Sequence, residues 1–170
     1  TSMDIEIRHS TMDDLPVIMQ IIDFGKEALR AQGVDQWEGD YPNEHTMMQD
    51  IERGISYVAT ADGKVVGTVC LDPEPEPAYD NEELHWKTPR EGTLVVHRLA
   101  ISKDSQGLGI ASKLLKYAAE ISPNGNKRGD TSEENKRMRA VFEKAGYQQV
   151  GLVEYTEDGG RICMGYEYLA

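Results

Sequence analysis

One passage, Leu94 to Glu120, constrains the fold of this chain more than any other. A run of apolar, β-favouring residues ends in five polar residues, which are followed by Gly107, Gly109 and an amphipathic stretch. The pattern predicts a strand over about 94–101 and a helix over about 106–121. Glycine in a helix costs about 1 kcal/mol relative to alanine, so two glycines at the start of this helix need a reason.

The two glycines fit an anion-binding site at the start of the helix. The first turn of a helix presents unpaired N–H groups and a partial positive charge, and together these bind phosphate. A glycine has no Cβ, which lets an anion approach the main chain closely. Successive amides from Gln106 to Ser112, which include Leu108, Ile110 and Ala111, can therefore face one ligand. The alternative is that the glycines only allow close helix–strand packing, for which one glycine suffices more readily than two.

Two common phosphate-binding patterns fit this passage poorly. A Walker P-loop needs Lys followed by Ser or Thr after its second glycine, and Ile110 and Ala111 stand there instead. A dinucleotide fingerprint fits loosely as G-x-G-x-x-S, with Asp130 at about the right distance to take a ribose hydroxyl. However, five residues separate the glycines from the strand, and "PNGNKRG" before Asp130 does not have the pattern of a buried strand. A nicotinamide-binding domain is therefore only the second alternative.

The remaining sequence predicts a mixed α/β domain. Asp62-Gly63 between two β-rich runs is a strong signal for a two-residue hairpin turn, and the proline- and acid-rich residues 73–91 predict a long surface loop without a core role. Thr131 with Glu134 resembles a capping box for a helix that ends at Gly146. Residues 1–170 are expected to form one domain. The expected order is strand 5–7, helix 15–29, helix 47–51, hairpin 56–71, strand 94–101, helix 106–121, a weak strand near 126–131, helix 131–145 and hairpin 148–168.

Composition narrows the possible function classes. The net charge of −12 disfavours nucleic acid as the main partner, because phosphate backbones need a basic surface. No apolar run approaches the roughly 20 residues that cross a bilayer, and the polar start "TSMDIEIRHS" is unlike a secretory leader. Cys70 and Cys163 lie far apart without metal-ligand spacing, so we expect reduced thiols and no metal in a cytoplasmic protein. An acidic surface favours cationic substrates through its field.

Three segments resemble the GNAT superfamily of N-acetyltransferases. "VVHRLAISKDSQGLGIASKLL", residues 95–115, resembles the pyrophosphate-binding segment of that family. "GDTSEENKRMRAVFEKAGYQQVG", residues 129–151, resembles the strand and helix that follow it, and "DQWEGDYPN", residues 35–43, resembles the substrate-side segment of a bacterial branch. The resemblance implies the GNAT fold, an α/β fold with a twisted, mostly antiparallel sheet that is splayed between its fourth and fifth strands and flanked by helices.

The same resemblance implies acetyl-CoA as the cofactor. By carry-over, the amides of Gln106 to Ser112 bind the pyrophosphate. The main chain of Leu99, Ala100 and Ile101 would pair with the pantetheine arm as if the arm were another strand. Asn135 would hydrogen-bond the arm from its other side, and the alternative role of Asn135 is a solvated position in the first helical turn.

Acyl transfer to an amine needs an oxyanion donor and a base. A main-chain N–H near Leu99, at the end of the splayed strand, can stabilise the oxyanion. His97 shares the facing of Leu99 by the two-residue period of a strand, and its free pKa of about 6.5 suits a general base. His97 is either that base or a packed, hydrogen-bonded strand residue, and Val95 stands where some relatives carry an acidic base. Further candidates, acting through a bridging water, are Asp72, Glu83 and His85.

The acid that protonates the departing thiolate is harder to assign. Many relatives carry a tyrosine in the last helix, where this chain has Phe142, and a phenyl ring has no proton to give. Phe142 would pack either against the end of the pantetheine arm or in the core. The thiolate has a free pKa of about 8.5 and can leave without an acid. Tyr147 is a remote substitute donor or, alternatively, a core residue.

The acceptor is expected to meet residues 35–43 and the loop 73–91. Trp37 and Tyr41 offer flat apolar surfaces, and Asp35 offers negative charge. Such a wall suits a cationic amine. The alternative is that residues 35–43 form a polar connector with one buried aromatic side chain.

These observations predict an acetyl-CoA-dependent N-acetyltransferase. The acetyl group would pass to a primary amine of a small molecule or peptide, by direct attack in a ternary complex. The first alternative is a non-catalytic acyl-CoA-binding or sensor module, which Phe142 and Val95 favour. No nucleic acid or membrane partner is expected. The chain is expected to be a monomer or a homodimer, since its closing hairpin can pair with a copy of itself.

Overall fold

The computed structural model describes residues 4–34, 36–37, 39–117, 121–156 and 160–170. The chain forms two compact units. Unit 1 comprises Thr1–Leu71 and His97–Tyr117, and unit 2 comprises Asp72–Val96 and Ala118–Ala170. A single domain over residues 1–170 stays a prediction. Within the described ranges, no helix combines the length and the apolar character that crossing a membrane requires.

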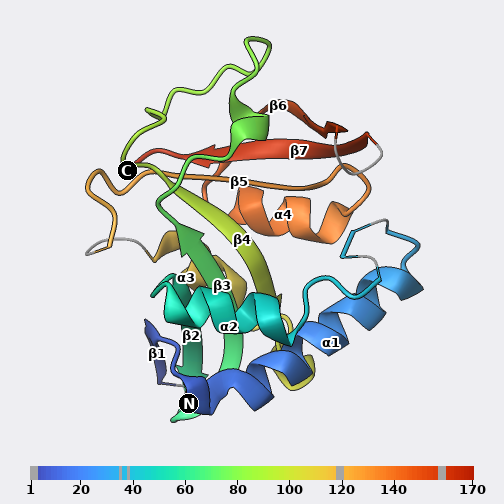
Figure 1. Cartoon of the computed structure of the whole chain (residues 1–170), viewed down its shortest axis with the longest axis vertical. Helices are drawn as coiled ribbons and strands as arrows, with labels where there is room; N and C mark the ends of the chain where they lie inside the picture. Colours follow the sequence, from blue (N-terminus) through green and yellow to red (C-terminus); the bar gives the residue numbers. More distant parts are fainter. Residues whose placement is uncertain (1–3, 35, 38, 118–120, 157–159) are drawn as a thin grey trace. The chain divides into compact units, whose positions relative to one another are not determined.

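The order of helices and strands agrees with the expected order (Figure 1). The elements, with η for a short 3-10 helix, are β1 (Ile5–His9), η1 (Met12–Asp14), α1 (Leu15–Ala31), α2 (Glu44–Glu52), β2 (Ser56–Ala61), β3 (Lys64–Asp72), η2 (Pro77–Tyr79), β4 (Leu94–Ile101), η3 (Lys103–Ser105), α3 (Ile110–Lys116), β5 (Lys127–Ser132), α4 (Lys136–Lys144), β6 (Gln148–Tyr155) and β7 (Arg161–Tyr168).

The strands hydrogen-bond in the order β1-β2-β3-β4-β5-β7-β6. The pairs β1–β2, β2–β3, β5–β7 and β6–β7 are antiparallel, whereas β4 pairs with β5 in parallel. Among the residues that the structure describes, this parallel pairing covers only Leu94–Val96 and Lys127–Gly129, although both strands continue further. The short pairing agrees with a splay between the fourth and fifth strands. The mixed α/β class and the mostly antiparallel sheet are confirmed.

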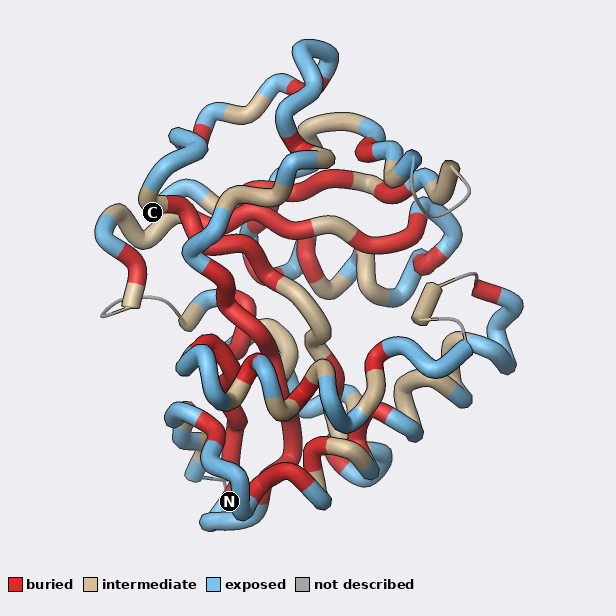
Figure 2. Tube along the Cα trace, in the orientation of Figure 1, coloured by how far each residue is buried: buried red, intermediate tan, exposed pale blue. Residues whose placement is uncertain are grey.

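In unit 1, helices cover both faces of the strands β2 and β3 (Figure 1). The core of one face joins Ile18 of α1 to Met47 of α2 and Val58 of β2, and each is at most 2% exposed. The helix α3 covers the other face, where a Cβ added to Gly67 of β3 would lie 3.2 Å from Cδ1 of Leu114. Because both faces are covered, β2 and β3 are buried over nearly their whole length (Figure 2).

The hairpin turn at Asp62-Gly63 is confirmed. β2 and β3 pair antiparallel up to Ala61 and Lys64, and φ is +51° at Asp62 and +85° at Gly63. A positive φ at both central residues is the signature of a type I′ turn, which favours Asp-Gly because the second residue has no Cβ to clash.

In unit 2, a helix covers one face of the strands and a loop covers the other. Phe142 of α4 stacks on Tyr166 of β7, with ring centroids 4.8 Å apart. On the opposite side, Tyr79 and Leu84 of the loop 73–91 form a core cluster with residues of β4, β6 and β7. The interpretation of this loop as a surface segment without a core role is therefore wrong, since Tyr79 is only 2% exposed.

The strand β5 has almost no apolar residues, and basic side chains explain its burial in unit 2. Arg128 is 6% exposed, and its Nε donates to Thr88 Oγ1 at 2.8 Å. Its Nη2 donates to the main-chain oxygen of Thr88 at 2.6 Å, and its guanidinium lies 4.4 Å from the ring centroid of Trp86. The weak strand predicted near 126–131 is confirmed, because its polar side chains find partners inside the unit.

Lys127 of β5 gives a testable pH dependence. Its side chain is 1% exposed, its Nζ lies 4.4 Å over the Tyr168 ring, and burial lowers the pKa of Lys127 to about 8. At pH values between about 8 and the ordinary pKa of 10.5, Lys127 is protonated in the unfolded chain but neutral in the folded chain. The free energy of unfolding therefore rises with pH over this range. Below pH 8 the buried charge opposes folding.

We therefore expect Lys127→Met to raise the free energy of unfolding at pH 7 by about 1–2 kcal/mol. The variant no longer buries a charge, and this gain exceeds the loss of the cation–π contact with Tyr168. The gain should shrink as the pH rises from 8 to 10. Urea unfolding of both proteins at pH 7 and pH 10 checks this expectation. An equal difference between the two proteins at both pH values would contradict it.

The predicted start of this helix near residue 106 is wrong. The helix α3 begins at Ile110 rather than near residue 106, because φ is +76° at Gly107 and +78° at Gly109. Left-handed residues cannot continue a right-handed helix. α3 ends at Lys116, and residues 118–120 of the predicted helix lie outside the described residues.

The predicted capping box at Thr131 is also wrong. Thr131 lies within β5, and α4 begins five residues later at Lys136. Asn135 caps this helix, since its side chain accepts a hydrogen bond from the Met138 N–H at 3.1 Å. The sequence signal misplaced the cap because β5 extends into the polar residues that precede the helix. The end of α4 is as predicted, with Gly146 at φ +91°.

Candidate active site

The segment between β4 and α3 is an ordered loop in unit 1. The Ser102 N–H donates to the main-chain oxygen of Val66 on β3 at 2.8 Å, which fixes the loop where β4 ends. The Gln106 side-chain amide donates to the main-chain oxygens of Ile101 at 2.8 Å and Ser102 at 3.3 Å. Gln106 therefore folds the loop back onto β4, and the two glycines follow directly after it.

The main chain at the two glycines is open on one side. Gly107, Leu108 and Gly109 are all exposed, and a Cβ added to either glycine would meet no atom within 4 Å. Close packing against a strand therefore does not explain these glycines. Ile110, which follows them, is 1% exposed and anchors the start of α3. The loop thus presents bare main chain on a rigid base, as an approaching anion requires.

Arg98 interrupts β4 within unit 1. Its φ is +51°, in the left-handed region that residues other than glycine rarely adopt. The two-residue period that predicts a shared facing for His97 and Leu99 does not hold across such a residue. Both neighbours are half-buried, and Ala100 is buried in the core of unit 1. The structure therefore places a left-handed kink, called the break in β4, directly before Leu99, the predicted oxyanion donor, although the strand continues to Ile101.

A buried ion pair holds Arg98 in this conformation. Its Nε and Nη2 each lie 2.7 Å from an oxygen of Asp50 on α2, and the two side chains are 12% and 4% exposed. Nη1 donates to the Tyr41 hydroxyl at 2.9 Å, and Nη2 contacts Cys70 Sγ at 3.4 Å. Burial alone would lower the pKa of Arg98, but the hydrogen bonds and charge of Asp50 raise it above its usual value. The break in β4 is thereby tied to α2 and to the segment that carries Tyr41.

Unit 2 contains a cluster of ionisable side chains around Asp130. The hydroxyls of Tyr79 and Tyr155 both donate to Asp130 Oδ2 at 2.5 Å. Burial, with the charge of Asp130, raises the pKa of both tyrosines and raises the pKa of Cys163 to about 12. These groups stay protonated near neutral pH. Asp130 therefore serves as the hydrogen-bond acceptor of the cluster rather than as a ribose ligand.

Glu76 lies beside this cluster and is a base candidate that sequence reasoning missed. Its side chain accepts from the Ala78 N–H at 3.2 Å. Burial raises the pKa of Glu76 above the ordinary glutamate value, and the charges of Asp130, Asp72 and Asp80 raise it further. A carboxylate with a raised pKa accepts a proton more readily near neutral pH. Among the other candidates, Asp72 is 9% exposed, whereas Glu83 and His85 are exposed.

The predicted cofactor residues of unit 2 lie in well-packed positions. Asn135 is 7% exposed and caps α4 through its side-chain oxygen, so the alternative of a solvated helical position is wrong. Phe142 is 1% exposed, and its ring packs on Tyr166 and Tyr147. Core packing, one of the two roles open to Phe142, is the one that the structure shows. Tyr147 is 3% exposed, and burial raises its pKa well above the usual value, as expected of a core residue.

Two predicted acceptor residues belong to unit 1, and Asp35 lies outside the described residues. Trp37 has φ +57° and packs against the core of unit 1; a Cβ added to Gly25 of α1 would lie 3.1 Å from its ring. Tyr41 is 48% exposed and holds Arg98 with its hydroxyl. Trp37 therefore contacts α1 and Tyr41 contacts Arg98, so these two aromatic residues do more than connect α1 to α2.

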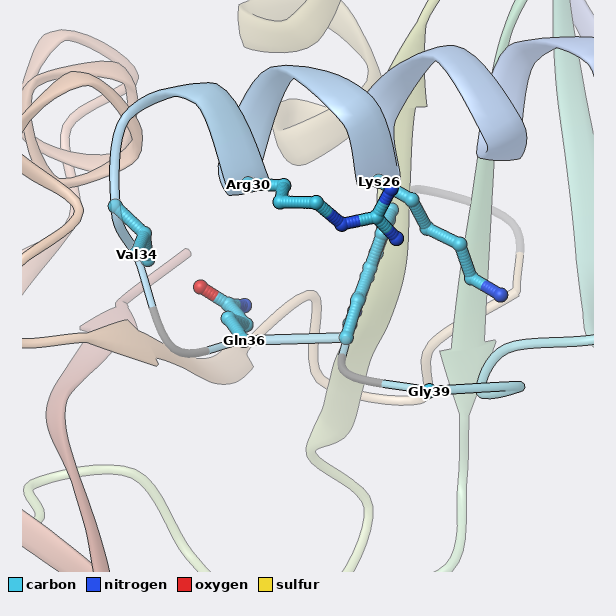
Figure 3. A pocket seen from close by; sticks show the side chains of 6 residues that line it. Lys26, Arg30, Val34, Gln36 and Gly39 are labelled. Carbon is cyan, nitrogen blue, oxygen red and sulfur yellow. The ribbon is translucent and has the colours of Figure 1, made fainter.

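Beside Trp37 lies a hollow of about 280 Å³ (Figure 3). It is lined by Lys26, Arg30, Val34, Gln36, Trp37 and Gly39. Among the described residues of its lining, the charged ones, Lys26 and Arg30, are basic, whereas the sequence suggests an acidic acceptor wall.

Sequence reasoning also missed Arg98 and Asp50. A charged side chain within the apolar run "LVVHRLAI" and an aspartate beside Met47, Met48 and Ile51 are signals that each side chain needs a partner in the interior. The left-handed backbone at Arg98 has no such signal.

Comparisons with known proteins agree with this geometry. The model of the acetyltransferase (GNAT) family matches residues 22–147. The N-acetyltransferase YesJ of Bacillus subtilis (strain 168), itself uncharacterized, is 25% identical over 130 residues, which cover 74% of this chain and 71% of that protein.

Solved structures are similar over nearly the whole chain. A GNAT-family acetyltransferase from Streptococcus agalactiae 2603 is 27% identical, with a TM-score of 0.87 and coverage of 98% of this chain and 95% of that one. The yncA protein of Salmonella typhimurium, whose structure contains its cofactor acetyl-CoA, is 13% identical, with a TM-score of 0.66 and coverage of 97% and 93%.

Proposed function

This chain belongs to the acetyltransferase (GNAT) family, and from that premise we propose that it transfers the acetyl group of acetyl-CoA to a primary amine of a small molecule or peptide. The amine attacks directly within a ternary complex. The nitrogen forms a bond to the acetyl carbon, the carbon–sulfur bond breaks, and the coenzyme A thiolate leaves. The amine loses one proton, which a base or the departing thiolate takes up.

Acetyl-CoA is the cofactor of this family, and the loop after β4 is the best candidate to hold its pyrophosphate. The observation that carries the proposal is the open main chain at Gly107 and Gly109, where an added Cβ meets nothing within 4 Å. In this proposal the amides from Gln106 to Ser112 bind the pyrophosphate. Leu99, Ala100 and Ile101 pair with the pantetheine arm, and Asn135 donates to the arm through its side-chain nitrogen.

The break in β4 supports a role for Leu99 in stabilising the oxyanion. The left-handed turn at Arg98 redirects the main chain just before the Leu99 N–H. A main-chain donor on a rigid strand needs no reorganisation when charge develops on the carbonyl oxygen. His97 stays the proposed base.

A non-catalytic acyl-CoA-binding module is the second candidate function. It is favoured by the buried phenyl ring of Phe142, which stands where many relatives carry a tyrosine that protonates the thiolate. We also place the protein in the cytoplasm, where the buried free thiols Cys70 and Cys163 stay reduced. A monomer and a homodimer both fit this proposal.

An amine panel tests the function. With acetyl-CoA and amines that include polyamines, aminoglycosides, amino acids and peptide N-termini, we expect release of free coenzyme A thiol with at least one class. Acetyl-CoA should also raise the melting temperature, and NAD should leave it unchanged, because only a ligand of the native state stabilises it. Binding of acetyl-CoA without thiol release on any amine would favour the non-catalytic module.

A further inference from the structure

We propose that the hollow beside Trp37 receives a carboxylate of the acceptor, so that the substrate is a small amine that also carries a carboxylic acid. This inference rests on the proposed acetyl transfer and names the substrate class. It is carried by two cations of α1, Lys26 and Arg30, which line the hollow.

The two cations lie on one face of α1. Lys26 and Arg30 are four residues apart, a spacing that places helical side chains one above the other. Both project from α1 toward the segment that carries Gln36 and Gly39 (Figure 3). Two of the described residues that line the hollow are therefore positively charged.

Within the described part of the chain, neither cation forms an ion pair. Asp23 and Glu27 stand three residues before Lys26 and Arg30, a spacing that allows ion pairs on a helix. Both cations line the hollow, where an anion would interact favourably with each of them.

A carboxylate fits the hollow better than a larger anion. The guanidinium of Arg30 presents a planar fork of donors that matches the two oxygens of a carboxylate. The hollow, at about 280 Å³, has room for little more than one small molecule. Trp37 adds a flat apolar wall for the carbon skeleton, and it is supported from behind by α1 at Gly25.

The pyrophosphate of the cofactor is the other source of negative charge. The open glycine loop after β4 already provides main-chain donors for that group. We therefore assign the hollow to the acceptor. The carboxylate at one end of the acceptor binds there and positions the attacking amine.

Paired substrates test this assignment. Each amino acid that the enzyme turns over is compared with its decarboxylated amine, for example L-phenylalanine with phenethylamine and L-leucine with 3-methylbutylamine. We expect kcat/KM to favour the carboxylated member by about tenfold or more, as a paired charge-assisted contact would give. In the variant Lys26→Gln/Arg30→Gln, most of this preference should be lost, while kcat/KM for the plain amine changes less than about twofold.

The control variant Lys64→Gln/Lys144→Gln removes the same charge from two exposed positions outside the hollow. This control should still favour the carboxylated substrate over its plain amine. That result would show that the preference depends on contacts in the hollow and not on the net charge of the protein. An unaltered preference in Lys26→Gln/Arg30→Gln overturns the proposal, and so does a wild-type enzyme that prefers the plain amine. A weakened affinity for acetyl-CoA with an unchanged acceptor preference assigns the hollow to the cofactor and also overturns it.

Calorimetry of the same pairs with the coenzyme A complex distinguishes this proposal from the proposed function. Tighter binding of the carboxylated member without thiol release would contradict acetyl transfer but support the carboxylate site. Thiol release with equal binding of both members would support acetyl transfer and contradict the site.

Discussion

A Gly109→Val variant loses acetyl-CoA binding, with an expected fall in affinity of about 100-fold or more. The bulky side chain occupies the space in which an added Cβ now meets nothing within 4 Å, and it displaces the pyrophosphate from the main-chain donors. Losing two charge-assisted hydrogen bonds is enough for a change of this size. Isothermal titration calorimetry with acetyl-CoA measures it directly.

Gly54→Val is the matched control for this variant. Gly54 has φ +72°, close to the +78° of Gly109, and an added Cβ there also meets nothing within 4 Å. Both variants should therefore lose about 1–2 kcal/mol of stability from backbone strain. Only Gly109→Val should lose cofactor binding. Unchanged affinity in a folded Gly109→Val protein contradicts the assigned pyrophosphate site.

An Asp50→Ala variant is expected to lose about 3–5 kcal/mol of stability, because it leaves a buried guanidinium without its counter-charge. Arg98 is held in a left-handed conformation by two contacts of 2.7 Å to this carboxylate. When the ion pair is lost, the strand break before Leu99 is no longer fixed, so acetyl transfer should fall as well. Urea unfolding and steady-state kinetics measure the two effects.

Asp80→Ala provides the comparison with an exposed ion pair. Asp80 accepts from Arg90 at 3.0 Å, and both side chains are more than 40% exposed, so the urea midpoint should hardly move. The double variant Asp50→Leu/Arg98→Met removes both charges and should regain much of the stability, but not the rate. Equal effects of Asp50→Ala and Asp80→Ala would show that the Asp50–Arg98 pair is not the main support of this region.

The order of elements can be predicted because most of them depend on local patterns. Asp62-Gly63 specifies its turn by conformational preference alone, and the apolar stripe that begins at Ile110 specifies a helix. Motifs at residues 95–115 and 129–151 suffice for the family, which the match over residues 22–147 confirms. The boundaries are less predictable, since β5 takes in Thr131 that reads as a helix cap.

Contacts between distant residues explain what could not be predicted. Arg98 and Asp50 are 48 residues apart, and no local pattern shows that they meet. The left-handed φ of Arg98 has no local signal either, so the simple alternation of β4 misleads. In the same way, the composition of residues 73–91 indicates exposure, although Tyr79 finds its partner, Asp130, 51 residues later.

The loop 73–91, which is part of unit 2, is fastened to the strands of that unit at several points. Tyr79 donates to Asp130, the Trp86 indole N–H donates to the Tyr79 main-chain oxygen at 3.0 Å, and the main-chain N–H of Thr88 donates to Glu167 at 2.9 Å. The hydrogen bonds to Asp130 and Glu167 fix the loop against the strands of unit 2, and the one from Trp86 joins two points of the loop itself. Changes in its length should be poorly tolerated between the anchors at Tyr79 and Trp86, because Leu84 in that span is 7% exposed and packs in the core cluster.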